Sequence, residues 1–163
     1  MLKLKIKKII IVTLLLLLIP AQMVGCNKSA QEAAPPVSAE LTDEQYLENV
    51  MDGLGKTSDG FQQISILLEE PNKDAAWEAK MNIELEKIRA ASLEYLGIQN
   101  VPERYSKVHE HITQAMLSNI LTVDSFPVKS ADQNAESLAI TTGYIREGGA
   151  SIEKAMEELD KVK

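Results

Sequence analysis

The chain has 163 residues with 24 acidic and 17 basic side chains, which give it a formal net charge of −7. Such an acidic chain is not expected to bind nucleic acid, and its folded part should be repelled by an anionic bilayer surface. Aromatic residues make up only 4% of the chain, which favours a helical core of Leu, Ile, Ala and Met over a sheet. The single cysteine excludes an intrachain disulfide.

The N-terminal segment has the pattern of an export signal. Lysines at positions 3, 5, 7 and 8 precede an apolar run over residues 9–19 that only Thr13 interrupts. A membrane-spanning helix needs about 20 apolar residues, and Pro20 and Gln22 interrupt the run before that length. The run instead matches the apolar region of a secretory signal peptide, which is about 7–15 residues long.

The residues that follow, Met23-Val24-Gly25-Cys26, resemble the lipobox of bacterial lipoproteins, although Met23 stands where that family usually has leucine. The resemblance implies that Cys26 carries a thioether-linked diacylglycerol and that signal peptidase II cuts between Gly25 and Cys26. Two acyl chains make a stable anchor, whereas one alone is marginal. The alternatives are an ordinary cleaved signal peptide, or an uncleaved anchor with an incidental cysteine.

Composition divides the chain into three parts: a lipoprotein signal peptide (residues 1–25), a lipidated N-terminus with a flexible tether (26–40), and a helical domain (41–163). The tether is small, polar and interrupted by Pro35-Pro36. At random-coil dimensions it would hold the domain on the order of 20 Å from the membrane. We therefore expect a protein of the cell membrane that is lipid-anchored on its extracytoplasmic face.

Helical periodicity begins at Leu41. Thr42 and Gln45 form a capping box, with Leu41 and Tyr46 as its hydrophobic staple, and Pro71 ends the segment. The predicted buried seam is Leu47, Val50, Leu54, Thr57, Phe61, Ile64 and Leu68. A second helix would be capped by Asn72 and would end at a left-handed Gly97. Its predicted buried face is Trp77, Met81, Leu85, Ile88, Ser92 and Tyr95.

The third helix is predicted to begin at Asn100 with Glu103, with Pro102 in its first turn and Phe126-Pro127 at its end. Its seam is Tyr105, Val108, Ile112, Ala115 or Met116, Asn119 and Val123. A capping box at residues 130–133 opens the fourth helix, whose seam is Ala135, Leu138, Thr142, Ile145, Gly149, Ile152, Met156 and Leu159. Four long helices with short connections predict an all-α, antiparallel up-down four-helix bundle.

Glycine is unusually frequent inside the first and fourth predicted helices. If these helices are antiparallel neighbours, their seams place Gly60 level with Gly143 and Gly55 level with Gly148, and Gly149 lies on the same seam. A helical glycine costs about 0.8–1 kcal/mol relative to alanine, so a compensating role is expected. Close packing of the two backbones is one interpretation. A shallow cleft or flexing point is a second, and a loop over residues 53–60 is a third.

Residues with catalytic or metal-binding chemistry are sparse. His109 and His111 flank Glu110, so both cannot face the core; His109, four residues after Tyr105, is predicted to point inward with Met116 two turns further on, and His111 to face solvent. A histidine and a methionine inside a bundle suggest a metal or haem carrier, but there is no C-x-x-C-H motif. The simpler interpretation is a partly buried histidine bonded to a neighbour. No cofactor is predicted.

No catalytic residues are predicted either. The chain lacks paired Glu-x-x-His motifs, H-E-x-x-H and a phosphate-binding glycine loop. The segment Pro102-x-x-Tyr105-x-x-x-His109, with the amphipathic helix after it, is similar to small helical lipoproteins of Gram-positive bacteria that have no assigned activity. We therefore expect a non-enzymatic interaction or scaffolding module with an envelope partner. The alternative is a small-ligand, metal or haem carrier near His109 and Met116, and a hydrolase has almost no support.

Overall fold

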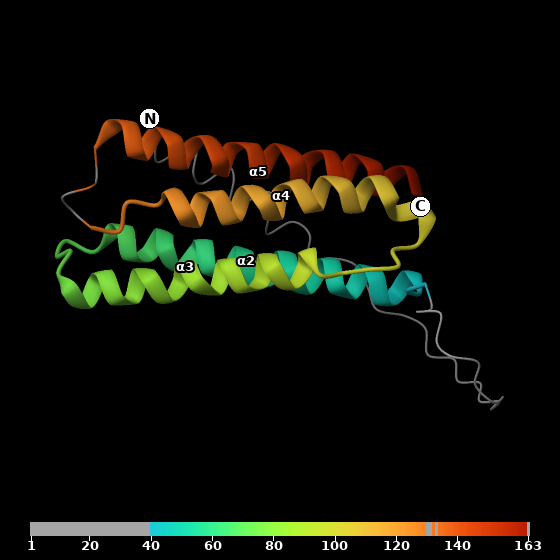
Figure 1. Ribbon diagram of the computed structural model, residues 1–163, viewed down its shortest axis with the longest axis horizontal. Helices are drawn as coiled ribbons and strands as arrows, with labels where there is room; N and C mark the ends of the chain where they lie inside the picture. The colour runs from blue at the N-terminus through green and yellow to red at the C-terminus, as the bar shows by residue number, and fades with distance from the viewer. Residues whose placement is uncertain (1–39, 130–131, 133, 163) are drawn as a thin grey trace, which may run out of the picture. The chain divides into compact units, whose positions relative to one another are not determined.

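The computed structural model describes residues 40–129, 132 and 134–162, and these form an all-α four-helix bundle (Figure 1). Its helices are α2 (Asp43–Glu69), α3 (Ala75–Leu96), α4 (Ser106–Ser125) and α5 (Ala135–Val162), with a short 3-10 helix, η2 (Glu103–Tyr105), before α4. The predicted signal, Cys26 and the tether up to residue 39 lie outside the described residues. None of the helices in the described part combines the length and apolar character needed to cross a bilayer.

Consecutive helices run in opposite directions. The indole Nε1 of Trp77, at the start of α3, donates to the carbonyl of Leu67 at the end of α2, 2.7 Å away. Arg89 of α3 pairs with Asp124 near the end of α4 at 2.5 Å. Ser125, the last residue of α4, accepts a hydrogen bond from Thr141 in the second turn of α5. Figure 1 shows each helix returning alongside the one before it.

The core consists of two apolar clusters separated along the bundle by polar residues. One cluster is built around Tyr46, Tyr95, Ile112 and Met116, and the other around Ile64, Trp77, Ile88 and Val123. Between them stands a buried polar residue on three of the helices: Thr57 on α2, Ser92 on α3 and Asn119 on α4. The predicted inner faces of α3 and α4 are confirmed, with Ala91 added to α3 and both Ala115 and Met116 buried on α4.

The predicted seam of α2 is wrong by one residue at alternate positions. Its buried residues are Tyr46, Val50, Gly53, Thr57, Gly60, Ile64 and Leu67. Val50, Thr57 and Ile64 were expected, but the other seam positions include two glycines, and the larger neighbours Leu54 and Phe61 are only half-buried. The fourth helix shows the same shift, because α5 buries Thr141, Gly148 and Ala155 in place of Thr142, Gly149 and Met156.

The glycines therefore serve contacts between consecutive helices. A Cβ on Gly53 would lie 3.2 Å from Cδ2 of Tyr95, and one on Gly60 would lie 2.5 Å from Cγ1 of Ile88, both on α3. A Cβ on Gly148 would lie 3.4 Å from Cβ of Ser118 on α4. The predicted pairing of Gly60 with Gly143 and of Gly55 with Gly148 is wrong, since nothing lies within 4 Å of a Cβ on Gly55, Gly143 or Gly149.

The ends of the helices follow local chemistry that the sequence only partly predicted. The capping box of Thr42 and Gln45 is confirmed. The cap of α3 is Asp74 rather than Asn72, and its carboxylate accepts the backbone N–H groups of Ala76 and Trp77. Gly97 is right-handed, with φ −80°. Asn100 has the positive φ, 58°, and α4 begins only at Ser106, so the predicted Asn100 cap is wrong.

Of the predicted capping box at residues 130–133, only Asp132 lies among the described residues. Asn134 instead caps α5, because its side-chain oxygen accepts the N–H of Ser137 at 2.9 Å while Ser137 Oγ accepts the N–H of Asn134. This reciprocal pair has the form of a capping box.

The start of α2 is bonded to the connection between α3 and α4. The N–H of Leu41 donates to the carbonyl of Asn100 at 2.8 Å, and the carboxylate of Glu40 accepts the N–H of Glu103 at 3.1 Å. Arg104 forms an ion pair with Asp43, with its Nε 2.8 Å from Oδ1. We call these contacts the entry clamp. It holds the point at which the chain enters the bundle.

Replacing Gly60 and Gly55 by alanine should change the free energy of unfolding in opposite directions. Gly60→Ala should lower the free energy of unfolding by about 1–3 kcal/mol, because the new methyl group overlaps Ile88. Gly55→Ala, in open space on the same helix, should raise it by about 0.5–1 kcal/mol, since alanine has the higher helix propensity. Urea unfolding followed by circular dichroism measures both changes. Equal effects at the two positions would contradict the assigned α2–α3 contact.

Candidate functional site

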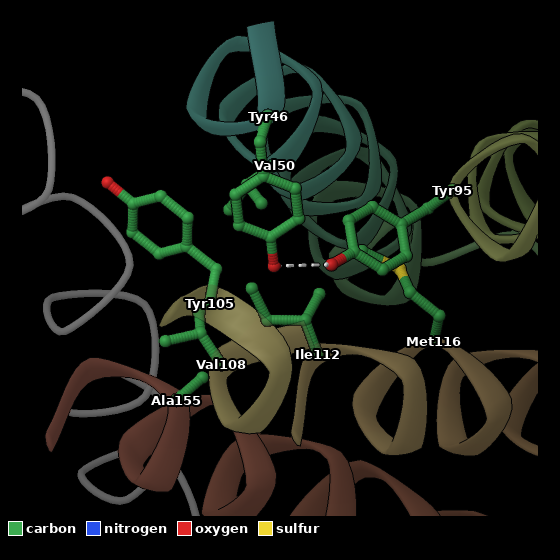
Figure 2. Close-up of a cluster of buried hydrophobic side chains, with 8 residues drawn as sticks. All are labelled: Tyr46, Val50, Tyr95, Tyr105, Val108, Ile112, Met116 and Ala155. Carbon is green, nitrogen blue, oxygen red and sulfur yellow. Dashed lines mark hydrogen bonds between the residues drawn. The ribbon is translucent and has the colours of Figure 1, made fainter. Parts of the chain in front are cut away.

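Three helices contribute polar groups to a hydrogen-bonded chain inside the first apolar cluster. The hydroxyl of Tyr46 on α2 lies 3.4 Å from that of Tyr95 on α3, and the Tyr95 hydroxyl lies 3.0 Å from Nδ1 of His109 on α4. Figure 2 shows the two tyrosine hydroxyls pointing toward each other above Ile112. We call Tyr46, Tyr95 and His109 the Tyr-Tyr-His chain.

The donors and acceptors of this chain have a natural direction. With the imidazole proton on Nε2, Nδ1 is an acceptor; in that tautomer Tyr95 donates to His109 and its oxygen is open to the Tyr46 hydroxyl. The 3.0 Å contact is a good hydrogen bond, whereas 3.4 Å is long for two hydroxyls. The bond between Tyr95 and His109 is therefore the stronger link.

Aromatic packing surrounds the chain. The rings of Tyr46 and Tyr105 stack with centroids 5.0 Å apart, and the imidazole of His109 lies 5.4 Å from the ring of Tyr95. Arg104 covers the outer side of Tyr105, with its guanidinium carbon 5.0 Å from the ring centroid. Tyr46 and Tyr95 are 0% and 2% exposed, so their hydroxyls depend on one another and on His109 for hydrogen bonds.

Burial favours the uncharged form of Tyr46, Tyr95 and His109. Loss of hydration raises the pKa of the Tyr46 hydroxyl, although its bond to Tyr95 opposes that rise, and raises the pKa of Tyr95 far above its usual value. Loss of hydration also lowers the pKa of the His109 imidazole below its ordinary 6.5. A neutral chain of this kind specifies how three helices fit together.

The candidate ligands of a carrier site are engaged by protein atoms. His109 Nδ1 is bonded to Tyr95, and the sulfur of Met116 accepts a hydrogen bond from the Asn119 amide at 3.7 Å. Met116 is fully buried, with its terminal methyl 3.6 Å from where a Gly53 Cβ would lie. Across the described residues, no three His, Cys, Asp or Glu side chains are grouped to hold a metal ion.

A surface hollow of about 250 Å³ lies beside the Tyr-Tyr-His chain, between α2 and α3. Its lining includes Gly53 and Tyr95, together with Asn49, Asp52 and Glu94. Lys56 already spans the two carboxylates, 2.6 Å from Asp52 and 2.8 Å from Glu94. The hollow therefore presents a polar rim whose charges are paired within the protein.

The structure brings together only some of the residues that the sequence singled out. Tyr105, His109 and Met116 belong to one region of the core, at the level of Tyr46 and Tyr95. Gly148 packs on α4, while Gly55 and Gly149 face open space and belong to no site. His111 was predicted to face solvent but is half-buried, with a buried Nδ1 that has no hydrogen-bond partner.

The tyrosine partners of His109 were not identified from the sequence. Tyr46 and Tyr95 were assigned to a staple and to a buried face, and no contact between them was predicted. A signal was present, because tyrosine hydroxyls on the buried faces of two adjacent antiparallel helices need polar partners. Comparison of the chain with protein-family models, curated proteins and solved structures finds no match.

The two tyrosines should differ in their contribution to stability. Tyr95→Phe removes the donor to His109 and leaves a half-buried imidazole nitrogen unpaired, so the free energy of unfolding should fall by about 1–2 kcal/mol. Tyr46→Phe removes only the 3.4 Å contact and should cost about 0.5 kcal/mol or less. Chemical denaturation of both variants tests the order. A larger loss for Tyr46→Phe would reverse our assignment of the stronger link.

The lowered pKa of His109 predicts a pH dependence of stability. The unfolded chain takes up a proton near pH 6.5, whereas folded His109 does so only at lower pH. The contribution of His109 to the free energy of unfolding is therefore fully present above pH 6.5. It decreases as the pH falls through that value toward the folded pKa. Between about pH 7 and pH 5, His109→Gln should show a weaker decrease than the wild type. An unchanged slope would assign the effect to other groups.

Proposed function

We propose that this protein is a lipid-anchored, extracytoplasmic component of a bacterial cell envelope and that its bundle is a non-enzymatic interaction or scaffolding module. The lysine-rich leader, the short apolar run and the Met23-Val24-Gly25-Cys26 segment support the location. The acyl chains on Cys26 attach the protein to the membrane, and the acidic domain stands away from the anionic surface.

The observation that carries the interaction role is the uncovered apolar flank of α5. This helix packs on α4 through small side chains, Thr141, Gly148 and Ala155. Four of its large apolar residues lie to one side of that contact: Leu138 is 46% exposed, and Ile145, Ile152 and Met156 are half-buried. Incompletely covered apolar surface on a soluble domain is typical of sites where another protein binds.

The end of α2 adds to this uncovered surface. Leu68 is 43% exposed and Phe61 is half-buried, on the side of α2 that the sequence had assigned to a seam with the fourth helix. The two stripes that were predicted to bury each other thus remain partly accessible. A protein partner that covers them would gain about 25 cal/mol for each Å² of apolar area removed from water.

The location predicts the chemical state of Cys26. Mass spectrometry of the protein from its native membrane should find a chain that begins at Cys26 and carries acyl groups. Cys26→Ser should remove the acyl groups and leave residues 1–25 attached, because the modified thiol is what the lipoprotein pathway recognises. An unmodified Cys26 thiol, or the intact chain in the cytosol, would contradict the proposed location.

The interaction role is tested separately by crosslinking in intact envelopes. Ile152→Glu should reduce recovery of an envelope partner several-fold, while Lys154→Glu, at an exposed polar position two residues away, should leave it unchanged. Circular dichroism of both variants checks that the bundle remains folded. Equal recovery with both variants would contradict a role for the α5 flank. Stoichiometric metal or a haem absorbance band in the native protein would instead favour a carrier that uses His109 and Met116.

A further inference from the structure

The outward side of α3 carries a second apolar stripe that no part of the bundle covers. Positions in 3-4 spacing along this side are all exposed, and we call them the outer stripe: Ala79, Ile83, Glu86, Ala90, Leu93 and Gly97. Ile83 is 56% exposed and Leu93 is 54% exposed, which makes them the two most exposed large apolar side chains among the described residues. A shallow hollow lies between Ile83 and Ala90 on this side.

The outer stripe lies opposite the face that α3 buries in the bundle, which runs from Trp77 through Ile88 to Tyr95. Apolar residues thus recur with helical spacing on both sides of one helix. A helix of that kind is normally buried on both sides. The small residues Ala79, Ala90 and Gly97 leave room for a second helix to approach the backbone closely.

We propose that the outer stripe is the contact surface for a second copy of this chain, packed antiparallel through α3 about a two-fold axis. In this register, Ile83 of one copy meets the partner's Leu93, and the two-fold axis repeats the contact. Glu86 faces the partner's Ala90 near the axis, and Ala79 faces the partner's Gly97. Ile83 of each copy therefore meets Leu93 of the other, and this reciprocity is what an isologous interface requires.

Charge supports the antiparallel direction. Lys80 and Glu94 lie beside the outer stripe toward its two ends, so antiparallel packing sets Lys80 of each copy beside the partner's Glu94. Glu86, in the middle of the stripe, comes between the partner's Lys87 and the partner's Arg89. Parallel packing would instead separate Lys80 from the partner's Glu94 by 14 residues, about 21 Å along the helices, so this pair could not form.

Lys80, Glu86 and Glu94 also form ion pairs within one chain, and these do not prevent them from pairing with the second copy instead. Lys80 lies 3.4 Å from Glu70, Glu94 lies 2.8 Å from Lys56, and Glu86 lies 3.3 Å from Arg89. All three pairs have an exposed carboxylate or ammonium group, and pairs of this kind contribute little to stability. Their partners can therefore change when a second chain arrives.

The interface is a single helix pair, so its affinity in solution is low. Membrane tethering, on which this inference rests through the proposed function, raises the effective concentration of the two copies. Dimerisation is then favoured on the membrane and requires high concentration in detergent. The dimer leaves the α5 flank of each copy available to another envelope protein.

The test uses disulfide formation in the full chain within its native membrane. Ile83→Cys with Leu93→Cys in one chain places two thiols about 15 Å apart on one helix, too far to bridge each other, but each lies opposite the partner's other thiol. Mild oxidation should give a disulfide-linked dimer. Either single variant should remain at the wild-type background, because its thiols are about 15 Å apart across the axis.

Charge exchange tests the register independently. In the double-cysteine chain, Lys80→Glu should lower the crosslinked fraction by about threefold to tenfold, and adding Glu94→Lys should restore it, since the opposite charges meet again. Lys154→Glu on α5 is the matched control and should have no effect. Failure of the second substitution to restore crosslinking, equal crosslinking of the single variants, or a disulfide to a different protein would overturn the proposal.

The same crosslinking of concentrated purified protein in detergent separates the two proposals. Dimer formation by a chain with an unmodified Cys26 would support the α3 interface and contradict the proposed location. A lipidated chain that forms no dimer either in membranes or in detergent would overturn the α3 interface alone.

Discussion

The contact between α2 and α3 at Gly53 and Gly60 is the constraint on which the rest of the bundle depends. Because neither residue has a side chain, the Tyr95 ring and the Ile88 side chain lie directly against the backbone of α2. This close approach sets the depth of Tyr95 in the core. At that depth its hydroxyl lies 3.4 Å from that of Tyr46 and 3.0 Å from Nδ1 of His109.

Small residues have a second consequence at the other side of the bundle. The α4–α5 contact uses Thr141, Gly148 and Ala155, and this choice turns the bulky residues of α5 away from the centre of the contact. The core gains a close helix pair, and the protein keeps apolar surface that a fully closed bundle would have buried. Together with the outer stripe of α3, this surface leaves apolar side chains accessible on two helices, and our two proposals assign each of them to an association.

The fold class and the inner faces of α3 and α4 could be predicted from the sequence because large apolar residues mark those faces without competition. On α2 and α5 the same reasoning failed, since leucine, phenylalanine and methionine stood next to glycine and alanine at alternative seam positions. The larger apolar area of Leu54 favours burying Leu54, whereas close approach of the two backbones favours burying Gly53. The residue on the adjacent helix, here Tyr95, determines which of the two is buried. His109 was placed correctly on the inner side of α4, but its partners come from other helices and depend on a register that periodicity does not specify.

The entry clamp lies where a force on the preceding segment would reach the domain. The chain enters α2 beside the connection between α3 and α4, and Glu40, Leu41 and Asp43 are each bonded to that connection. A pull on the preceding segment would therefore act against these bonds, which must break before the start of α2 can separate from the connection. If the protein is anchored through residue 26 as we propose, a force on the anchor would reach the bundle at these contacts.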